Sequence, residues 1–416
     1  MQNPFFNDGS GRNLGDIKLI NRAVIFRTIR EAGAISRSEL AKVSGLNPAT
    51  VTHIARELTS LGLIEEAGIT ESKGGRPSTL LKIRSQAGYI IAVHLDRYFM
   101  RAMITDLNLE ERIFSEIYAT QTDKTSQINI ENLLNIIDEL IQKSKVNERE
   151  LVGIGICAPG PLNVKEGVLL TPPNFPGWPS TPIRKIIEDR FHLPTFLEQD
   201  ANASASAEKL FGQMREAENF IFLLADGGLG GGVMIGGEIY HGEECTAGEI
   251  GHTTVDMNGP QCSCGNYGCL ELYASPWAVR RYVLDQLEQG RQAETLMMIV
   301  KGDSKQVSFK TIVEAAEAKD PLCLEGIERM RNALAAGITN LANIFDPEAI
   351  VVGGEIEFAE KLLHDHLVNA IKTRTLSGNK KPVQLHFSEM GQDVQIIGAF
   401  SLVLRELFQN PSMLRK

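Results

Sequence analysis

The amino-acid sequence predicts an α/β protein with a small helical head at the N-terminus and a larger body. Residues 17–62 carry apolar side chains at helical spacing, interrupted by single glycines. From residue 89 onward, short apolar strands alternate with amphipathic helices, which is typical of α/β domains. The chain has 416 residues, more than one hydrophobic core usually organises, so we expect two or three domains.

The distribution of charge separates the head from the body. The whole chain has a net charge of −10, yet residues 1–84 contain 12 Lys and Arg against 8 Asp and Glu. The remaining residues contain 30 against 44. A basic head on an acidic body is expected when only the head meets the phosphates of a nucleic acid.

The composition excludes several classes of protein. With 43% hydrophobic and 23% charged residues, the chain lacks the composition of a disordered protein. It contains no run of about 18 apolar residues that would cross a membrane, so no membrane partner is expected. The first residues lack the basic and then apolar pattern of a secretory signal. We therefore expect a cytoplasmic protein with reduced thiols.

The head begins with two predicted helices. Apolar residues from Ile17 to Ile29 predict the first helix, which Gly33 ends. Ser36, with Glu39 three residues later, forms a capping box that opens the second helix, and Gly45 follows it. A short glycine turn before another helix is the spacing of a helix-turn-helix motif.

A third helix completes this motif. Asn47 is expected to cap it, with Pro48 at its first position, and it runs to Gly62. Its inward face is apolar: Val51, Ile54, Leu58 and Leu61. Its outward residues suit base edges and phosphates in the major groove of DNA: Asn47, Thr50, Thr52, His53 and Arg56. A three-helix bundle with no role in DNA binding would show the same face.

The segment after the third helix predicts a two-stranded wing with a basic tip. The alternating pattern at residues 79–83 predicts its second strand. Lys73 and Arg76 lie at the tip, where they are expected to contact phosphates or the minor groove. Residues 1–84 are thus expected to form a winged helix-turn-helix domain that binds DNA.

The body begins at residue 85 with an expected three-stranded meander, a helix and a strand. These elements are predicted at 89–95, 99–106, 112–119, 128–143 and 151–157. Further along, the sequence predicts the strand 349–352 and helices at 277–292, 309–318, 324–344, 358–374 and 398–408.

A stretch in the middle of the body has the composition of a closed metal site. His252, Cys262, Cys264 and Cys269 lie within 18 residues, interleaved with glycines. Three thiolates and one imidazole fill the tetrahedral shell of Zn²⁺ and leave no open position, which predicts a structural zinc ion. The alternative is a chance cluster of reduced cysteines. The isolated cysteines are expected to be core thiols: Cys157, Cys245 and Cys323.

This stretch resembles the signature of the ROK proteins (repressors, open reading frames and sugar kinases). The signature combines Gly-Glu-x-Gly-His with Cys-x-Cys-Gly-x-x-Gly-Cys-Leu-Glu, and residues 248–252 and 262–271 match it throughout. The resemblance implies that the histidine and the three cysteines hold zinc. It also implies that Glu249, His252 and Glu271 face the hydroxyls of a sugar.

The resemblance also implies a two-lobed, actin-like body, with lobes expected at 85–200 and 201–416. Asn174 and Asp200 are the further candidates for contact with the sugar. In ROK kinases an Asn-Asp pair supplies the general base; here Gln199 replaces the asparagine and Asp200 is kept. Without the resemblance, an aspartate at this place is more often only a helix cap.

The phosphate-binding motifs of the kinases are altered in this chain. The kinases carry Gly-Thr-Gly-x-Gly-Gly-Gly, whereas Asp226 and Gly227 stand where the first glycine and the threonine would be. Their Asp-x-Gly-Gly-Thr motif corresponds to the stretch from His94 to Tyr98. A carboxylate at a phosphate-binding turn repels the ligand. A tight hairpin with no ligand would need the same glycines.

These observations predict a sugar-responsive repressor of carbohydrate genes and not an enzyme. Its expected partners are operator DNA, a sugar or sugar-phosphate effector, and a second copy of itself in a homodimer or homotetramer. Two alternatives stay open: a sugar kinase with an appended DNA-binding domain, and a repressor controlled by a partner protein.

Overall fold

The computed structural model describes residues 14–69, 78–97, 99–118, 126–170, 178–376, 382–410 and 413. The predicted contacts of Lys73, Arg76 and Asn174 fall outside these residues. The chain forms two compact units that are not continuous in sequence. The first comprises Met1–Ile156, Pro182–Leu197 and Ala399–Lys416, and the second Cys157–Thr181 and Glu198–Gly398. The boundaries expected at residues 84 and 200 stay predictions.

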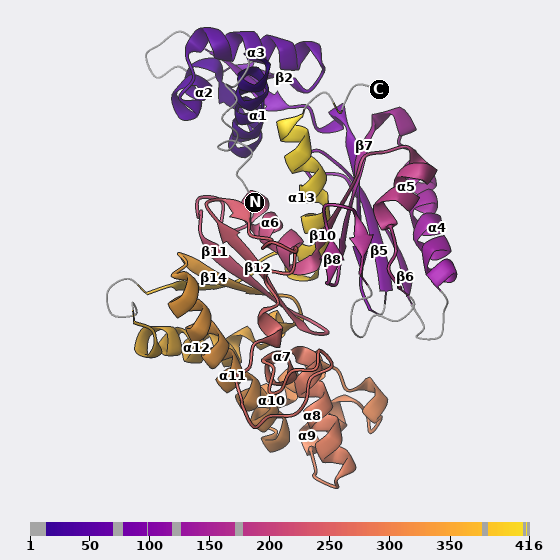
Figure 1. The fold of residues 1–416 in the computed structure, drawn as a ribbon, viewed down its shortest axis with the longest axis vertical. Helices are drawn as coiled ribbons and strands as arrows, with labels where there is room; N and C mark the ends of the chain where they lie inside the picture. The colour runs from indigo at the N-terminus through magenta and orange to yellow at the C-terminus, as the bar shows by residue number, and fades with distance from the viewer. Residues whose placement is uncertain are drawn as a thin grey trace. The chain divides into compact units, whose positions relative to one another are not determined.

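The three helices of the head follow from local sequence, and all three predictions are confirmed. They are α1 Leu14–Ala32, α2 Arg37–Ser44 and α3 Pro48–Ser60 (Figure 1). The Ser36 side chain accepts a hydrogen bond from the backbone N–H of Glu39, and Gly45 ends α2 in the left-handed conformation. The Asn47 side chain caps α3 in the same way, through the N–H of Thr50.

The wing contains one strand more than expected. β2 Ile64–Ile69 and β3 Thr79–Ile83 form the predicted antiparallel pair. A third strand, β1 Ile35–Ser36, pairs with the other edge of β3. β1 has only two residues, which are too few to show a periodic pattern. It is therefore a strand only because it pairs with β3.

The sheet of the first unit has the order β10-β7-β4-β5-β6. Its strands are β4 Tyr89–Leu95, β5 Phe99–Asp106, β6 Arg112–Tyr118, β7 Leu151–Ala158 and β10 Thr195–Gln199. Every residue of β7 is buried, as expected for a strand covered on both faces. α4 Ser126–Ser144 packs on β5 and β6, and α5 Ile183–Phe191 precedes β10. The predicted meander, helix and strand are therefore confirmed.

The second unit is built on the sheet β13-β12-β11-β14-β15. Its strands are β11 Phe220–Ala225, β12 Leu229–Ile235, β13 Glu238–Ile239, β14 Ala349–Gly353 and β15 Gln384–Phe387. β14 lies parallel to both β11 and β15, and a small ladder pairs β8 Leu162–Asn163 with β9 Val168–Leu169. Because β15 is a short edge strand with three of its four residues at least partly exposed, its sequence carries little strand signal.

Helices of the second unit cover this sheet and extend away from it (Figure 1). They are α6 Asp200–Phe211, α7 Glu271–Ala274, α8 Pro276–Glu288, α9 Glu294–Ile299, α10 Phe309–Glu317, α11 Pro321–Phe345 and α12 Glu360–Arg374. Short 3-10 turns precede several of them, including η3 Ile250–His252 and η5 Glu355–Ala359. The predicted long helices of this unit are confirmed as α8, α10, α11 and α12, whereas the short helices α7 and α9, of four and six residues, were not predicted. No helix in the described part of the chain is long and apolar enough to cross a membrane.

The C-terminal helix α13 runs from Val394 to Gln409 and belongs to the first unit from Ala399 onward. Its backbone lies directly on β7: a Cβ added at Gly155 would lie 1.9 Å from the carbonyl oxygen of Ala399. Near its other end, the Phe408 ring meets Phe26 of α1 edge to face, at 5.4 Å between centroids. The sequence predicted this helix four residues too short at its start.

We expect Gly155→Ala to destabilise the protein by about 3 kcal/mol or more, because the new methyl group would collide with backbone rather than with a movable side chain. Chemical denaturation measures the effect. Gly290→Ala is the matched control: it meets no atom within 4 Å but has a φ of +88°, so it costs only backbone strain, about 1 kcal/mol. Equal losses of unfolding free energy in the two variants would contradict the close approach of α13 to β7.

Candidate functional site

The candidate site lies on the loop between β13 and α7, in the second unit. At two positions the backbone of this loop packs closely against another backbone segment. The backbone N–H of Gly231 donates to the carbonyl of Gly248 at 2.9 Å, and Gly248 has a φ of +90°. Gly268 has a φ of +60°, and a Cβ there would lie 1.7 Å from the carbonyl oxygen of Asp256. Only glycine fits both positions, which explains part of the spacing of the motif.

The loop gathers the four predicted metal ligands. One ligand atom each from His252, Cys262, Cys264 and Cys269 lies within 4.8 Å of all the others. Cys262 Sγ is 3.6 Å from His252 Nδ1, and Cys264 Sγ is 3.7 Å from Cys269 Sγ. Burial, and then hydrogen bonding with the neighbouring thiols, raises the pKa of Cys269 to about 12. A bound cation would stabilise the Cys269 thiolate and offset this effect, as in a metal site.

The isolated cysteines behave as predicted in two of three cases. Cys157 and Cys323 are buried. The prediction for Cys245 is wrong: it is only half-buried, on the loop before Gly248, with a φ of +58°. A single cysteine between polar residues gives no indication of burial.

Glu249 and Glu271 lie on either side of the His252 ring. Glu271 Oε1 is 3.5 Å from Nδ1, the nitrogen that faces the thiols. Glu249 Oε2 is 3.9 Å from Nε2, the opposite nitrogen. Burial raises the pKa of Glu249, while His252 and a hydrogen bond from Gln199 act in the other direction. The imidazole of His252 thus lies between the thiol cluster and Glu249, one of the predicted sugar-binding carboxylates.

Asp200 opens α6 at the end of β10, as expected for a side chain at a strand terminus. Its Oδ1 accepts a hydrogen bond from the N–H of Ala201 at 2.7 Å, but the N-cap residue of α6 is Gln199, so Asp200 is not the helix cap that the sequence left open. A Cβ added at Gly230 would lie 3.9 Å from this oxygen. This is an ordinary contact distance, and Asp200 itself is half-buried.

Two polar contacts of this site were not predicted. The Gln199 side chain does not cap α6; its Nε2 donates to Glu249 Oε1 at 3.1 Å. His241 Nε2 lies 2.7 Å from Glu198 Oε2, in a largely buried pair that holds the loop before Glu249 to the end of β10. The partners are 50 and 43 residues apart in sequence, so no local pattern would have shown these pairs.

The outward face of α3 is largely as predicted. Asn47, His53 and Arg56 are exposed, whereas Thr50 and Thr52 are half-buried. Asn47 also caps the helix, and the Thr52 hydroxyl donates to the carbonyl of Pro48 at 2.7 Å. Exposed His53 and Arg56 are therefore the side chains most available to a partner. The sequence did not indicate that Glu57, on the same helix, is held by Lys18 and Arg22 of α1.

His94, at the altered phosphate motif, is unsuited to carry charge. It is buried in β4, and burial lowers its pKa to about 4. Its ring packs edge to face on Phe99, at 5.4 Å between centroids. A histidine in this environment stays neutral near pH 7.

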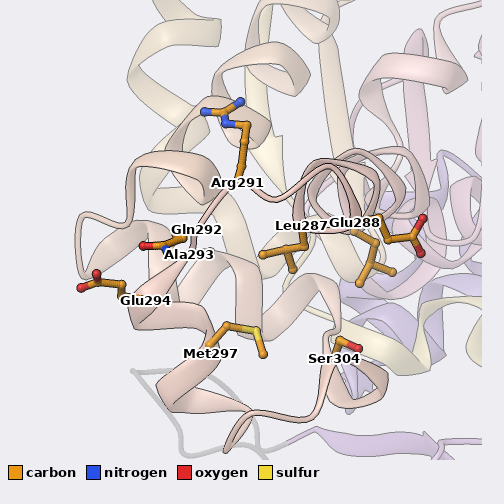
Figure 2. A pocket seen from close by; sticks show the side chains of 9 residues that line it. Leu287, Glu288, Arg291, Gln292, Ala293, Glu294, Met297 and Ser304 are labelled. Carbon is orange, nitrogen blue, oxygen red and sulfur yellow. The ribbon is translucent and has the colours of Figure 1, made fainter.

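A separate pocket of about 590 Å³ lies between α8 and α9 (Figure 2). Apolar side chains from the two helices form part of its wall, among them Leu284, Leu287 and Met297. Its cation, Arg291, is paired with Glu325 at 2.8 Å. None of the predicted site residues lines this pocket.

Comparison with known proteins finds matches for both the head and the body of the chain. The ROK family profile matches residues 96–406, and the MarR family profile matches residues 20–68. The chain is 31% identical to a putative xylose repressor of Caldicellulosiruptor sp. (strain Rt8B.4), over 95% of this chain and 98% of that protein. It is 32% identical to the DNA-binding transcriptional dual regulator NagC of Escherichia coli (strain K12), over 95% of each chain.

Solved structures show the same relation. A ROK family transcriptional regulator, described as a homologue of the E. coli MLC protein, matches with a TM-score of 0.81 and 28% identity, over 96% of this chain and 100% of that one. A ROK family glucokinase from Streptomyces griseus, solved with glucose and AMPPNP, matches with a TM-score of 0.67 and 28% identity, over 76% and 99%. The protein is a member of the ROK family that carries a MarR-like helix-turn-helix head.

Proposed function

We propose that this protein is a sugar-responsive transcriptional repressor. The head binds operator DNA, and a sugar or sugar phosphate bound by the second unit releases it. One observation carries the proposal: a single chain joins a helix with exposed polar residues to a metal-type cluster that lies beside two carboxylates. The two relatives, one named as a repressor and one as a transcriptional dual regulator, match both parts at once, over 95% of this chain.

Zinc is the metal that best suits the cluster. Bonds of about 2.3 Å to sulfur and 2.1 Å to nitrogen give tetrahedral edges of roughly 3.8 Å between sulfurs and 3.6 Å between sulfur and nitrogen. The separations of 3.7 Å and 3.6 Å are close to these values. His252, Cys262, Cys264 and Cys269 would hold the ion, whose role is structural because the four ligands complete its shell.

The carboxylates of the site are suited to recognising hydroxyl groups. Glu249 and Glu271 lie 3.9 and 3.5 Å from the two nitrogens of the His252 ring, and Asp200 lies at the start of α6. A charged acceptor contributes about 1.5–3 kcal/mol per hydrogen bond, so several such bonds account for specific binding of a polyol ring. We assign Asn174 to the same site because of its place in the family motif.

Release of DNA requires that the sugar-bound and sugar-free forms differ in affinity for the operator. In a dimer with two heads, a change in the separation of the heads would prevent them from occupying both half-sites. Two-fold symmetry of the operator follows from this arrangement. Control by a partner protein acting on the same equilibrium is an alternative that shares these parts.

Removing one exposed cation from α3 should weaken DNA binding. We expect Arg56→Ala to lower the salt dependence of operator affinity by a slope of about one, because one phosphate contact is lost. Fluorescence anisotropy at several salt concentrations measures this slope. Arg27→Ala, an exposed arginine of α1 paired with Glu31, is the control with the same charge change and should leave the slope unaltered. An unaltered slope in both variants would remove α3 from the DNA interface.

Loss of one thiol should abolish both metal binding and the response to the effector. We expect Cys264→Ser to lose most of its zinc and, with it, the orientation of Glu249 through His252. Metal analysis of the purified protein, with operator release as the second readout, tests this. Cys245→Ser, a half-buried cysteine outside the cluster, should keep the metal. A wild-type protein that contains no zinc but still responds to its effector would contradict the proposal.

Asp200→Asn should weaken effector binding about 10- to 150-fold while leaving operator affinity intact, since one charged acceptor is lost. Isothermal titration with xylose, glucose, N-acetylglucosamine and their phosphates measures the binding. Asp189→Asn, on the exposed face of α5, is the control and should bind as the wild type does.

The same variant separates the repressor from a sugar kinase, the alternative favoured by the retained Asp200. Phosphoryl transfer depends mainly on positioning and charge neutralisation, to which a base adds only about 10²- to 10⁴-fold. We therefore expect no useful ATP turnover. Turnover on the order of 1 per second with any of these sugars, lost in Asp200→Asn, would establish the kinase instead.

A further inference from the structure

Asp226 lies in the tight turn between β11 and β12, in the second unit (Figure 1). Its backbone N–H donates to the carbonyl of Gly228 at 3.1 Å, which closes the turn. ROK kinases place glycine and threonine where this chain has Asp226 and Gly227. The substitution introduces a carboxylate into a turn that otherwise offers only backbone.

The Asp226 carboxylate is bound by a second turn, the one that follows β14. Its Oδ1 accepts a hydrogen bond from the backbone N–H of Glu355 at 2.6 Å. A Cβ added at Gly354 would lie 2.4 Å from the same oxygen. The carboxylate thus lies directly on the 354–355 peptide, where a glycine is needed for the contact.

The other oxygen is bound by a buried amide at the start of α13. Gln395 Nε2 donates to Asp226 Oδ2, and Gln395 is only 4% exposed. Its Oε1 has no hydrogen-bond partner among the described residues, so this bond is the one that the amide makes there. Without Asp226, a buried amide donor would be left unsatisfied, which is costly in a protein interior.

The neighbouring backbone donor is also taken by an acidic side chain. The N–H of Gly354 donates to Glu357 Oε1 at 3.1 Å. Burial, with the negative charges of Asp226 and Glu208 nearby, raises the pKa of Glu357 to about 7. Successive N–H groups of this turn are therefore both occupied by carboxylates of the chain itself.

We infer that Asp226 is a built-in substitute for a phosphate group, and that it excludes phosphate-bearing ligands such as a nucleotide from this turn. It presents what a phosphate would present: a negative charge and two acceptor oxygens, bound by a backbone N–H and a side-chain amide. An external phosphate would have to displace a tethered carboxylate and would be repelled by it at contact distance.

The inference deepens the proposed function, since a repressor with this turn needs no nucleotide. It rests on that proposal only in taking the body not to be a kinase. Binding is measured without sugar, DNA or turnover. Failure of the phosphate-binding test would therefore leave the proposed repressor function standing. Failure of operator binding would leave this inference standing.

The test restores the sequence of the kinase turn. Asp226→Gly combined with Gly227→Thr should create saturable binding of inorganic phosphate, at least 10-fold tighter than in the wild type. Thermal stabilisation and isothermal titration measure it, against sodium chloride of equal ionic strength. Adding Glu357→Gln should tighten binding further, because it removes the second charge. Asp303→Gly is the matched control: this exposed aspartate also accepts a backbone hydrogen bond, from Lys305 at 3.0 Å, and its loss should create no binding.

Two results would overturn the inference. One is binding of phosphate or ATP by the wild type as tight as by the restored variant. The other is a restored variant that keeps its metal and its melting transition but gains no affinity for phosphate. Should that variant fail to fold, Asp226→Asn replaces it: it keeps the shape, removes the charge and should bind phosphate measurably more tightly than the wild type. Equal binding by Asp226→Asn and the wild type would also reject the inference.

Discussion

The candidate site is arranged around one imidazole ring. His252 directs Nδ1 toward the thiols and Nε2 toward Glu249, and Glu271 lies beside the first nitrogen. A histidine that ligates a metal through one nitrogen must carry its proton on the other, which makes that nitrogen a hydrogen-bond donor. The metal-type cluster therefore has a role beyond cross-linking the loop. It sets the position and partner of the carboxylate expected to meet the sugar.

Carboxylates serve opposite purposes in two places of the second unit. Glu249 lies beside a histidine and accepts a hydrogen bond from Gln199, and 37% of its side chain stays exposed. Asp226 and Glu357 have their oxygens bound by backbone and by Gln395. The same chemical group is thus an open acceptor in one place and an internal ligand in the other. The surrounding donors, and not the residue type, decide which role a carboxylate has.

Glycine has a comparable double role along this chain. At Gly45 it ends a helix in the left-handed conformation, a local role that any sequence pattern would reveal. At Gly155 and Gly354 it permits contact with segments more than a hundred residues away. For such positions the reason for glycine lies in the tertiary neighbour and is not visible nearby in the sequence.

Much of the architecture was determined by the sequence alone. Helices α2 and α3 carry their own caps, Ser36 and Asn47, and the strands β4 to β7 carry dense apolar patterns, so local free energy specifies them. The metal ligands were predictable because three cysteines and a histidine on one short loop are forced into proximity by chain connectivity alone. Only the tertiary structure decided which side chain faces which. The strand β1, the bond from Gln199 to Glu249, the pair of His241 with Glu198, and the binding of Asp226 by Glu355 and Gln395 join residues far apart in the chain. Each of these contacts depends on packing between distant segments, for which a linear pattern of residues contains no signal.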